Sequence, residues 1–267
     1  MKVNDDIKTV VVLGMHRSGT SLVAGILERL GVNMGKRQIG IHWSNPLGHY
    51  ENVDFVKMDD MILNVAGGAW DDPPEISSIL EVSSNEKLLR KIQEVVKKNE
   101  DRIWGWKVPT TSLTIELYLP FLRNPYFIIC YRDPQEIVKS LQKRDGMDPR
   151  KARKLIEVYN ESIKQFLNRH PNLKVMEIEY RSILANPKDA VQQIINFIGI
   201  NPSQERVTNA IEFVLPREKI EQLQAELKRK EWMYLVIDTL RNPYIIRRYL
   251  YKALKNPSYT LKKLGLK

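Results

Sequence analysis

Apolar runs and helical patterns alternate along the first 200 residues of the chain. The first run, residues 7–13, is rich in β-branched side chains and ends at Gly14, which is typical of a buried parallel strand. After the loop at residues 14–19, helical spacing of apolar side chains continues until Gly31, a typical helix stop. These apolar residues are Leu22, Val23, Ile26, Leu27 and Leu30. A strand, a loop and a helix in this order predict the opening of a βαβ unit.

The same alternation predicts three more strands, at residues 102–108, 126–131 and 173–178. Helices are expected at about 52–66, 85–99 and 148–168, and from Pro134 and Pro187, since a first helical turn tolerates proline. Strands that alternate with helices predict an α/β fold with a parallel, doubly wound sheet flanked by helices.

A helical insertion interrupts this order after the first helix. It begins with a polar stretch from Gly35 to Gly48 and continues with the helices at 52–66 and 85–99, around an irregular segment that holds residues 71–74. Ligands of doubly wound sheets bind beyond the carboxyl ends of the strands, and long insertions there usually shape the substrate pocket.

Nine of the ten net positive charges lie in residues 228–267. This segment contains eleven lysines and arginines and only two acidic residues, Glu231 and Asp238. We therefore expect an α/β domain over residues 1–227 and a helical, basic C-terminal extension over 228–267. Tyrosine and tryptophan residues are interleaved with the charges, which is typical of a surface that contacts an anionic membrane or polysaccharide. Nucleic acid is the less favoured partner. A solvated helical face, or a tail packed on its own domain, explains the charge equally well.

The apolar run near the N-terminus is too short for a signal peptide, and no run of about 18 apolar residues occurs. We therefore expect a cytoplasmic protein, in peripheral contact with a membrane at most. The single cysteine, Cys130, excludes an intrachain disulfide and is expected to be a buried strand residue. Tandem carboxylates such as Asp59-Asp60 are expected on the solvated surface.

Residues 14–21, Gly-Met-His-Arg-Ser-Gly-Thr-Ser, have the outline of a P-loop between a strand and a helix. In such a loop, backbone N–H groups and the helix N-terminus converge on phosphate oxygens. The lysine that nucleotide hydrolases carry after the second glycine is replaced by Thr20, and the cation is Arg17 instead. The strand at 126–131 continues into Arg132 and not directly into a Mg²⁺-binding aspartate. Both departures argue against ATP or GTP hydrolysis.

The segments MHRSGTS and FIICYRDPQEIVKSL resemble the two donor-binding signatures of the P-loop sulfotransferases that use 3′-phosphoadenylyl sulfate (PAPS). The resemblance implies that the first segment binds the 5′-phosphosulfate through Arg17, Ser18, Gly19, Thr20 and Ser21. It also implies that Arg132 and Ser140, eight residues apart, bind the 3′-phosphate. An arginine fork and a serine hydroxyl are suited to a terminal phosphate.

Two further segments extend the resemblance to roughly residues 7–200. In EIEYRSILANPKDAVQQIINFIGI, Tyr180 matches a tyrosine that lies against the adenine in the family. In WGWKVPTTS, Lys107 matches a lysine near the transferred group. The resemblance therefore implies a PAPS-dependent sulfotransferase with a P-loop-type sheet, which releases PAP and uses Arg17 and Lys107 as catalytic cations without a metal ion.

The general base stays open between two residues. The branch of the family that sulfates small phenols carries a histidine two residues after the lysine, where this chain has Pro109. The branches that sulfate carbohydrates and proteins use a glutamate in the insertion after the first helix. Glu51 is the first candidate there and His49 the second, although a carboxylate is also favoured in a first helical turn. A hydroxyl or amine acceptor on a carbohydrate, glycan or glycolipid is implied by this analogy.

Two other functions stay open as alternatives. A P-loop kinase that acts on a small metabolite would explain the loop, but not Thr20 in the lysine position or the pair of Arg132 and Ser140. A non-catalytic, sulfotransferase-like scaffold would retain the fold and its basic surface without turnover. His16 is expected to line the wall of the loop, and no histidine lies in a pattern that indicates a metal site.

Overall fold

The computed structural model of the protein describes residues 7–241. The chain divides into two compact units, the first formed by residues up to 41 together with 47–216. The second contains residues 42–46 and the helix α11 (Arg217–Arg241). The first unit holds the sheet and every residue predicted for the donor site.

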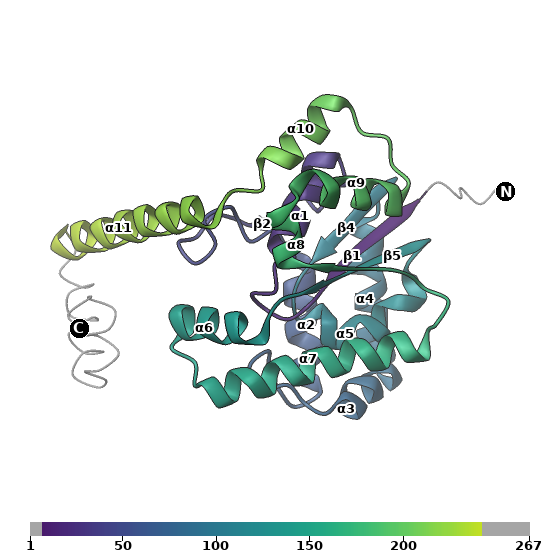
Figure 1. Cartoon of the computed structure of the whole chain (residues 1–267). Helices are drawn as coiled ribbons and strands as arrows, with labels where there is room; N and C mark the ends of the chain where they lie inside the picture. Colours follow the sequence, from purple (N-terminus) through teal and green to yellow (C-terminus); the bar gives the residue numbers. More distant parts are fainter. Residues whose placement is uncertain (1–6, 242–267) are drawn as a thin grey trace. The chain divides into compact units, whose positions relative to one another are not determined.

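Four parallel strands form the central sheet, in the order β4-β1-β5-β6 (Figure 1). They are β1 (Lys8–Leu13), β4 (Ile103–Lys107), β5 (Pro125–Tyr131) and β6 (Lys174–Glu179). From β1 the chain passes to β4 on one side and then to β5 on the other. The P-loop after β1 therefore lies at the switch point where such sheets bind ligands. The predicted fold, a doubly wound parallel sheet flanked by helices, is confirmed.

Alternate side chains of β1 face two different cores. Val11 and Leu13 belong to the core that also contains residues of four helices beside the sheet, among others. These are α2 (Val53–Val65), α4 (Glu86–Asn99), α5 (Thr111–Tyr118) and α7 (Pro149–Arg169). Val10 and Val12 belong to the opposite core, with α1 (Thr20–Leu30), α9 (Pro187–Ile198) and α10 (Gln204–Glu212). Figure 1 shows the two groups of helices on opposite faces of the sheet.

An aspartate or asparagine followed by proline starts three of the predicted helices. Asp133 and Asp148 each accept hydrogen bonds from two backbone N–H groups, at the start of α6 (Pro134–Asp145) and of α7. Asn186 accepts one at the start of α9. A side-chain cap before a proline is a strong start signal, so the sequence predicts these boundaries well.

The insertion between α1 and β4 differs from the expectation in its details. The polar stretch and the residues directly after it form a hairpin of two short antiparallel strands, β2 (Gln38–Ile39) and β3 (Glu51–Asn52). Asn52 caps α2 by accepting a hydrogen bond from the N–H of Asp54, so Glu51 precedes the helix and does not lie in its first turn. The segment expected to be irregular also contains the short helix α3 (Ile76–Glu81) and a 3-10 turn (Val82–Ser84).

Asp59 corrects the expectation that tandem carboxylates lie on the surface, because its side chain is fully buried. Thr110 and Thr111 donate to Asp59 Oδ2 at 3.0 and 2.7 Å, and Thr114 and Tyr118 donate to Oδ1 at 2.7 and 2.8 Å. These four hydroxyl groups replace the hydrogen bonds to water that the carboxylate loses when it is buried. Burial nevertheless raises the pKa of Asp59 to about 6.

The second unit brings the loop residues 42–46 together with α11. The Nζ atom of Lys228 lies 5.3 Å from the ring centroid of Trp43, and His42 Nε2 lies 3.9 Å from Glu231 Oε1. The basic segment 228–267 begins inside α11, but residues 242–267 lie outside the described residues, so its role stays a prediction. Among the described helices, none has the length and hydropathy needed to span a bilayer.

Candidate active site

The loop between β1 and α1 has the backbone of a phosphate-binding loop. Gly14, Arg17 and Gly19 have positive φ angles, of 144°, 70° and 98°. A Cβ at Gly14 would lie 2.7 Å from Ser18 Oγ, so only glycine fits there. Ser18 closes the loop internally, since its N–H and its hydroxyl both donate to the Met15 carbonyl, at 3.1 and 2.7 Å. No side chain caps the N-terminus of α1 in the described part of the chain, which leaves the N–H groups of Thr20 and Ser21 available to an anion.

Ser112, at the start of α5, is hydrogen-bonded to the first residue of this loop. The Gly14 N–H donates to Ser112 Oγ at 2.9 Å, and Ser112 Oγ donates back to the Gly14 carbonyl at 3.3 Å. Ser162 of α7 donates to the Ser112 carbonyl at 3.0 Å. Ser112 lies in the segment WGWKVPTTS that carries Lys107, but its role was not predicted because no sequence pattern relates it to Gly14.

The second predicted phosphate-binding segment is in direct contact with the loop. Arg17 Nε donates to Ser140 Oγ at 2.8 Å, and Arg132 Nη1 donates to the Arg17 carbonyl at 3.1 Å. The Arg132 guanidinium lies 4.3 Å from the ring centroid of Tyr180, at the start of α8 (Tyr180–Ala185). Tyr180 packs against Gly19, where an added Cβ would lie 2.7 Å from the ring. Three segments distant in sequence, the loop, residues 132–140 and the start of α8, thus bring the predicted donor-binding residues together.

Arg132 also forms an ion pair with Glu136 on the following helix. Its Nε lies 2.8 Å from Glu136 Oε2, and the other carboxylate oxygen of Glu136 binds Arg181 Nη2 at 2.9 Å. The hydrogen bond from Arg132 lowers the pKa of Glu136. This pair holds the guanidinium of Arg132 beside the loop.

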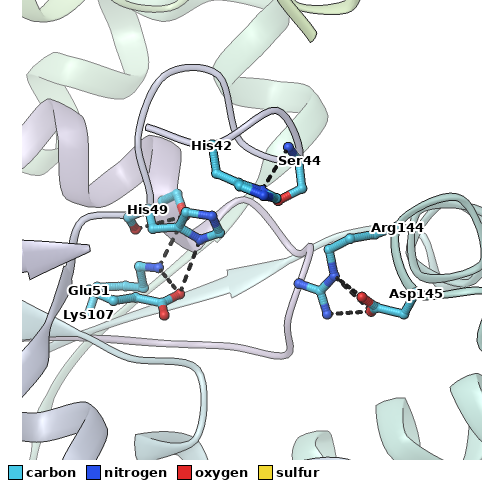
Figure 2. A network of polar contacts seen from close by, with 8 residues as sticks. His42, Ser44, His49, Glu51, Lys107, Arg144 and Asp145 are labelled. Carbon is cyan, nitrogen blue, oxygen red and sulfur yellow. Dashed lines mark hydrogen bonds and ion pairs between the residues drawn. The ribbon is translucent and has the colours of Figure 1, made fainter. Parts of the chain in front are cut away.

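Lys107 and Glu51 form a buried ion pair next to the start of α1. Lys107 Nζ lies 2.8 Å from Glu51 Oε1 and donates to Ser21 Oγ at 3.1 Å. The Lys107 side chain is 1% exposed and that of Glu51 is 16% exposed. Lys107 ends β4 and Glu51 begins β3, and Figure 2 shows the ammonium group directed at the carboxylate. A position on the solvated surface is therefore excluded for Lys107.

His49, the second candidate base, lies beside this pair. Its Nδ1 is 3.9 Å from Glu51 Oε1, and its backbone carbonyl accepts a hydrogen bond from Ser21 Oγ at 3.1 Å. Figure 2 shows the imidazole next to Glu51 and Lys107. Ser21 therefore connects both candidate bases and Lys107 to the helix that follows the P-loop.

Burial and ion pairing oppose each other in this cluster. Burial would raise the pKa of Glu51, but the Lys107 ammonium and a hydrogen bond with His49 hold it well below its usual range, so that the carboxylate is ionised. Burial lowers the pKa of Lys107, and Glu51 offsets part of this effect. Burial and the nearby Arg144 lower the pKa of Arg17 to about 10, which leaves it a cation at neutral pH.

His16 lies in the wall of the loop, as expected, and has aromatic neighbours. Its ring centroid is 4.7 Å from that of Trp70 and 5.8 Å from that of Tyr159. Burial, and then the charge of Arg144, lowers the pKa of His16 to about 3, so the imidazole is neutral at physiological pH. Its Nε2 is buried without a hydrogen-bond partner among the described residues. These neighbours come from distant segments, which is why the sequence does not predict them.

The model of the sulfotransferase family matches residues 9–204, well over half of the chain. The chain belongs to the sulfotransferase family. This sulfotransferase uses PAPS as its sulfuryl donor, as predicted from the resemblance of its two phosphate-binding segments.

Solved sulfotransferases are similar to this one at low identity. The sulfotransferase domain of the Synechococcus PCC 7002 olefin synthase is 16% identical, with a TM-score of 0.50 over 76% of both chains. Sulfotransferase STF9 from Mycobacterium avium is 15% identical, with a TM-score of 0.48 over 84% of this chain and 77% of its own. The sulfotransferase domain of the curacin biosynthetic pathway is 18% identical, with a TM-score of 0.48 over 75% and 76%. The likeness to the olefin synthase domain shows the fold. No curated protein sequence matches the chain.

Proposed function

We propose that this sulfotransferase transfers the sulfuryl group to a hydroxyl or amine of a carbohydrate, glycan or glycolipid, with Glu51 as the general base. The observation that carries the proposal is the buried pair of Glu51 and Lys107, which contacts Ser21 at the start of α1. With a glutamate in this insertion, the chain resembles the branches of the family that sulfate carbohydrates and proteins. Pro109 stands where the small-phenol branch has its histidine.

The residues around the loop fit PAPS. In this proposal Arg17 and the backbone N–H groups of residues 19–21 hold the 5′-phosphosulfate, where the N-terminus of α1 has no side-chain cap within the described residues. Arg132 and Ser140 hold the 3′-phosphate, and Tyr180 lies against the adenine. When bound, PAPS supplies a sulfuryl group that passes to the acceptor as its bond to the bridging phosphate oxygen breaks.

Lys107 and Glu51 have complementary roles in the proposed reaction. The acceptor transfers its proton to the Glu51 carboxylate as its oxygen or nitrogen bonds to sulfur, and the cations Lys107 and Arg17 stabilise negative charge around the transferred group. The Lys107 ammonium keeps Glu51 ionised, but it also weakens Glu51 as a base. A shift of Lys107 Nζ away from Glu51 would raise the basicity of the carboxylate when the proton has to be taken.

The test of this proposal is an acceptor screen with the purified protein and labelled PAPS, in which glycans, glycolipids and phenols compete and mass spectrometry identifies the products. Glu51→Gln should then lower kcat on the best acceptor about 100-fold or more, as loss of a general base does, and should leave the Kd of PAP unchanged. His49→Gln is the matched neighbour and should lower kcat less than tenfold. The reverse order would assign the base to His49, and sulfation of phenols alone would contradict the acceptor class.

The basic segment has a proposed role in reaching the acceptor. We infer that residues 228–267 contact an anionic membrane or polysaccharide that carries the acceptor, and that the enzyme is a cytoplasmic protein in peripheral contact with that surface. The support is the net charge of +9 in this segment and the tyrosines and tryptophan interleaved with it.

A further inference from the structure

Tyr50, the residue directly before Glu51, has a left-handed backbone. Its φ angle is 55°, a conformation that residues with a Cβ seldom adopt. Such a conformation persists only where surrounding contacts hold it, and it is most often found at functional sites. Because Tyr50 leads the chain into β3, its backbone conformation sets the direction in which the chain enters that strand at Glu51.

Two side chains hold Tyr50, Arg29 of α1 and Phe213 directly after α10. Arg29 Nη1 donates to the Tyr50 hydroxyl at 3.1 Å and to the Gly25 carbonyl at 2.9 Å. The Phe213 ring stands edge-on to the Tyr50 ring, with centroids 5.9 Å apart and an angle of 85° between the planes. The Arg29 guanidinium lies 3.6 Å from the Phe213 ring centroid. Each of these three side chains therefore contacts the other two. We call Tyr50, Arg29 and Phe213 the Tyr50 clamp.

Gly25 shows how closely this clamp packs against α1. Glycine is unfavourable inside a helix, and Gly25 lies in the middle of α1. A Cβ at this position would lie 2.3 Å from the Phe213 ring and 3.1 Å from the Tyr50 ring. The two rings thus occupy the space of a side chain, and Gly25 is needed for the clamp to reach the helix.

We propose that Tyr50 is a positioning residue for Glu51, and that α1 supports the donor and the base together. The N-terminus of α1 follows the P-loop, while Gly25 and Arg29 of the same helix hold Tyr50. A single rigid helix then keeps the phosphate-binding loop and the Glu51 carboxylate at a constant distance, as in-line transfer requires. This inference rests on the proposed role of Glu51 as the base.

Loosening the clamp should impair proton transfer and leave donor binding intact. Without it, β3 is less restrained, and the Glu51 carboxylate leaves the position from which it takes the proton of the acceptor and separates from Lys107 Nζ. Arg29 and Phe213 also line an open cleft of about 500 Å³, together with Glu28, Asn209 and Glu212. A shorter side chain at position 29 therefore opens to solvent and does not leave a buried void, so variants at this position are suited to the test.

The experiment follows hydrolysis of ³⁵S-labelled PAPS, with water as the acceptor and PAP and sulfate as products, so that no knowledge of the natural acceptor is needed. Tyr50→Phe and Arg29→Gln should each lower the rate constant at least fivefold, while the Kd of PAP stays within twofold. Tyr50→Gly, which adopts a positive φ freely but lacks the ring, should lower it at least 50-fold. Carbon-13 NMR of the Glu51 carboxyl should show a higher pKa in each variant, because Glu51 has moved from Lys107.

Tyr126 provides a matched control. Its hydroxyl accepts a hydrogen bond from Lys174 Nζ at 3.3 Å, and its ring stands edge-on to Phe197 with centroids 5.5 Å apart. Tyr126 lies at the start of β5, at the opposite end of the strand from Arg132. Tyr126→Phe should therefore leave the hydrolysis rate and the Glu51 pKa unchanged.

Several results would overturn the inference. An active Tyr50→Gly enzyme would show that the ring contacts are not needed, and a loss of PAP affinity that matches the loss of rate in Tyr50→Phe would reduce Tyr50 to a structural role. If Tyr50→Gly does not fold, Tyr50→Phe and Arg29→Gln decide. A Glu51→Gln enzyme that hydrolyses PAPS at the wild-type rate would contradict the proposed function itself. An inactive Glu51→Gln enzyme beside active clamp variants would overturn the positioning role alone.

Discussion

Each of the two proposed phosphate-binding segments contains an arginine, Arg17 or Arg132, that contacts the protein through only some of its N–H donors. A guanidinium has five N–H donors in a rigid plane. Arg17 uses its Nε on Ser140, and Arg132 uses Nε on Glu136 and Nη1 on the Arg17 carbonyl. These contacts fix the direction of both planes before a donor arrives, so that less conformational freedom is lost on binding.

The residue-scale prediction separates the two phosphate sites. Arg132→Ala should weaken PAP by about 2–5 kcal/mol, the usual effect of removing one partner of a buried charge pair, because only PAP carries the 3′-phosphate. The same change should weaken adenosine 5′-phosphosulfate far less. Isothermal titration of both ligands measures the difference.

The control for this experiment is Arg181→Ala. Arg181 binds the other oxygen of Glu136, at 2.9 Å, but its side chain is 61% exposed. We expect this variant to bind PAP within twofold of the wild type. If Arg132→Ala weakened both nucleotides equally, Arg132 would have a structural role and the assignment of the 3′-phosphate to it would be wrong.

At the scale of helices and strands, the sequence predicts elements that carry their own signals. The four strands are apolar runs, and α6, α7 and α9 begin with a capping residue and a proline. By contrast, α5 was not predicted, because its side chains are buried on nearly every side and show no apolar stripe. The strand that holds Glu51 has only two residues, too few for a pattern. Both depend on contacts with distant segments, and so does the pairing of Glu51 with Lys107.

Asp59 links α2 to α5, and its titration gives the element-scale prediction. Its pKa of about 6 in the folded protein lies above the 3.8 of an ordinary aspartate, so the folded state binds the proton more tightly. The stability that this group contributes is therefore fully present below pH 3.8 and is lost as the pH rises through 6. The loss amounts to about 3 kcal/mol at 1.36 kcal/mol per pKa unit.

Urea unfolding of the wild type and of Asp59→Asn at several pH values tests this prediction. The variant has no group to titrate there, so the difference in unfolding free energy between the two proteins should change by about 3 kcal/mol between pH 3 and 8. Asp60→Asn, at the exposed neighbouring position, should show a much smaller change. A pH-independent difference for Asp59→Asn would mean that the four hydroxyl groups fully compensate the burial of the charge.

At the scale of the whole molecule, the positive charge is distributed very unevenly. The first 227 residues are close to neutral, and in the described part of the active site Lys107 and Arg132 are each paired with a glutamate. The net charge of the protein therefore comes from residues 228–267 and not from the donor site. Charge that is concentrated in one segment produces a local field that attracts an anionic surface, and salt screens that field over about 10 Å at 0.1 M.

The last prediction concerns this basic segment. Replacing the eight lysines and arginines from Arg241 to Lys267 with glutamine should lower binding to vesicles that contain anionic phospholipid, or to an acidic polysaccharide, by at least 100-fold at low salt. Each cation contributes about 1 kcal/mol near an anionic surface, and wild-type binding should weaken steeply as salt is added. Vesicle sedimentation and titration with the polysaccharide measure the two surfaces separately. PAP should bind the variant with unchanged affinity, because the proposed donor site lies in the first unit.

A control variant with four exposed cations of α7 changed to glutamine, Arg150, Arg153, Lys154 and Lys164, should keep most of the binding. Truncation after Gln224 should likewise leave PAP binding intact and lower turnover on the natural acceptor. A truncated protein that fails to fold would show that the segment packs as part of the domain. In that case the basic residues would form a solvated face and the docking role would be wrong. The same conclusion would follow if the glutamine variant bound both surfaces as tightly as the wild type.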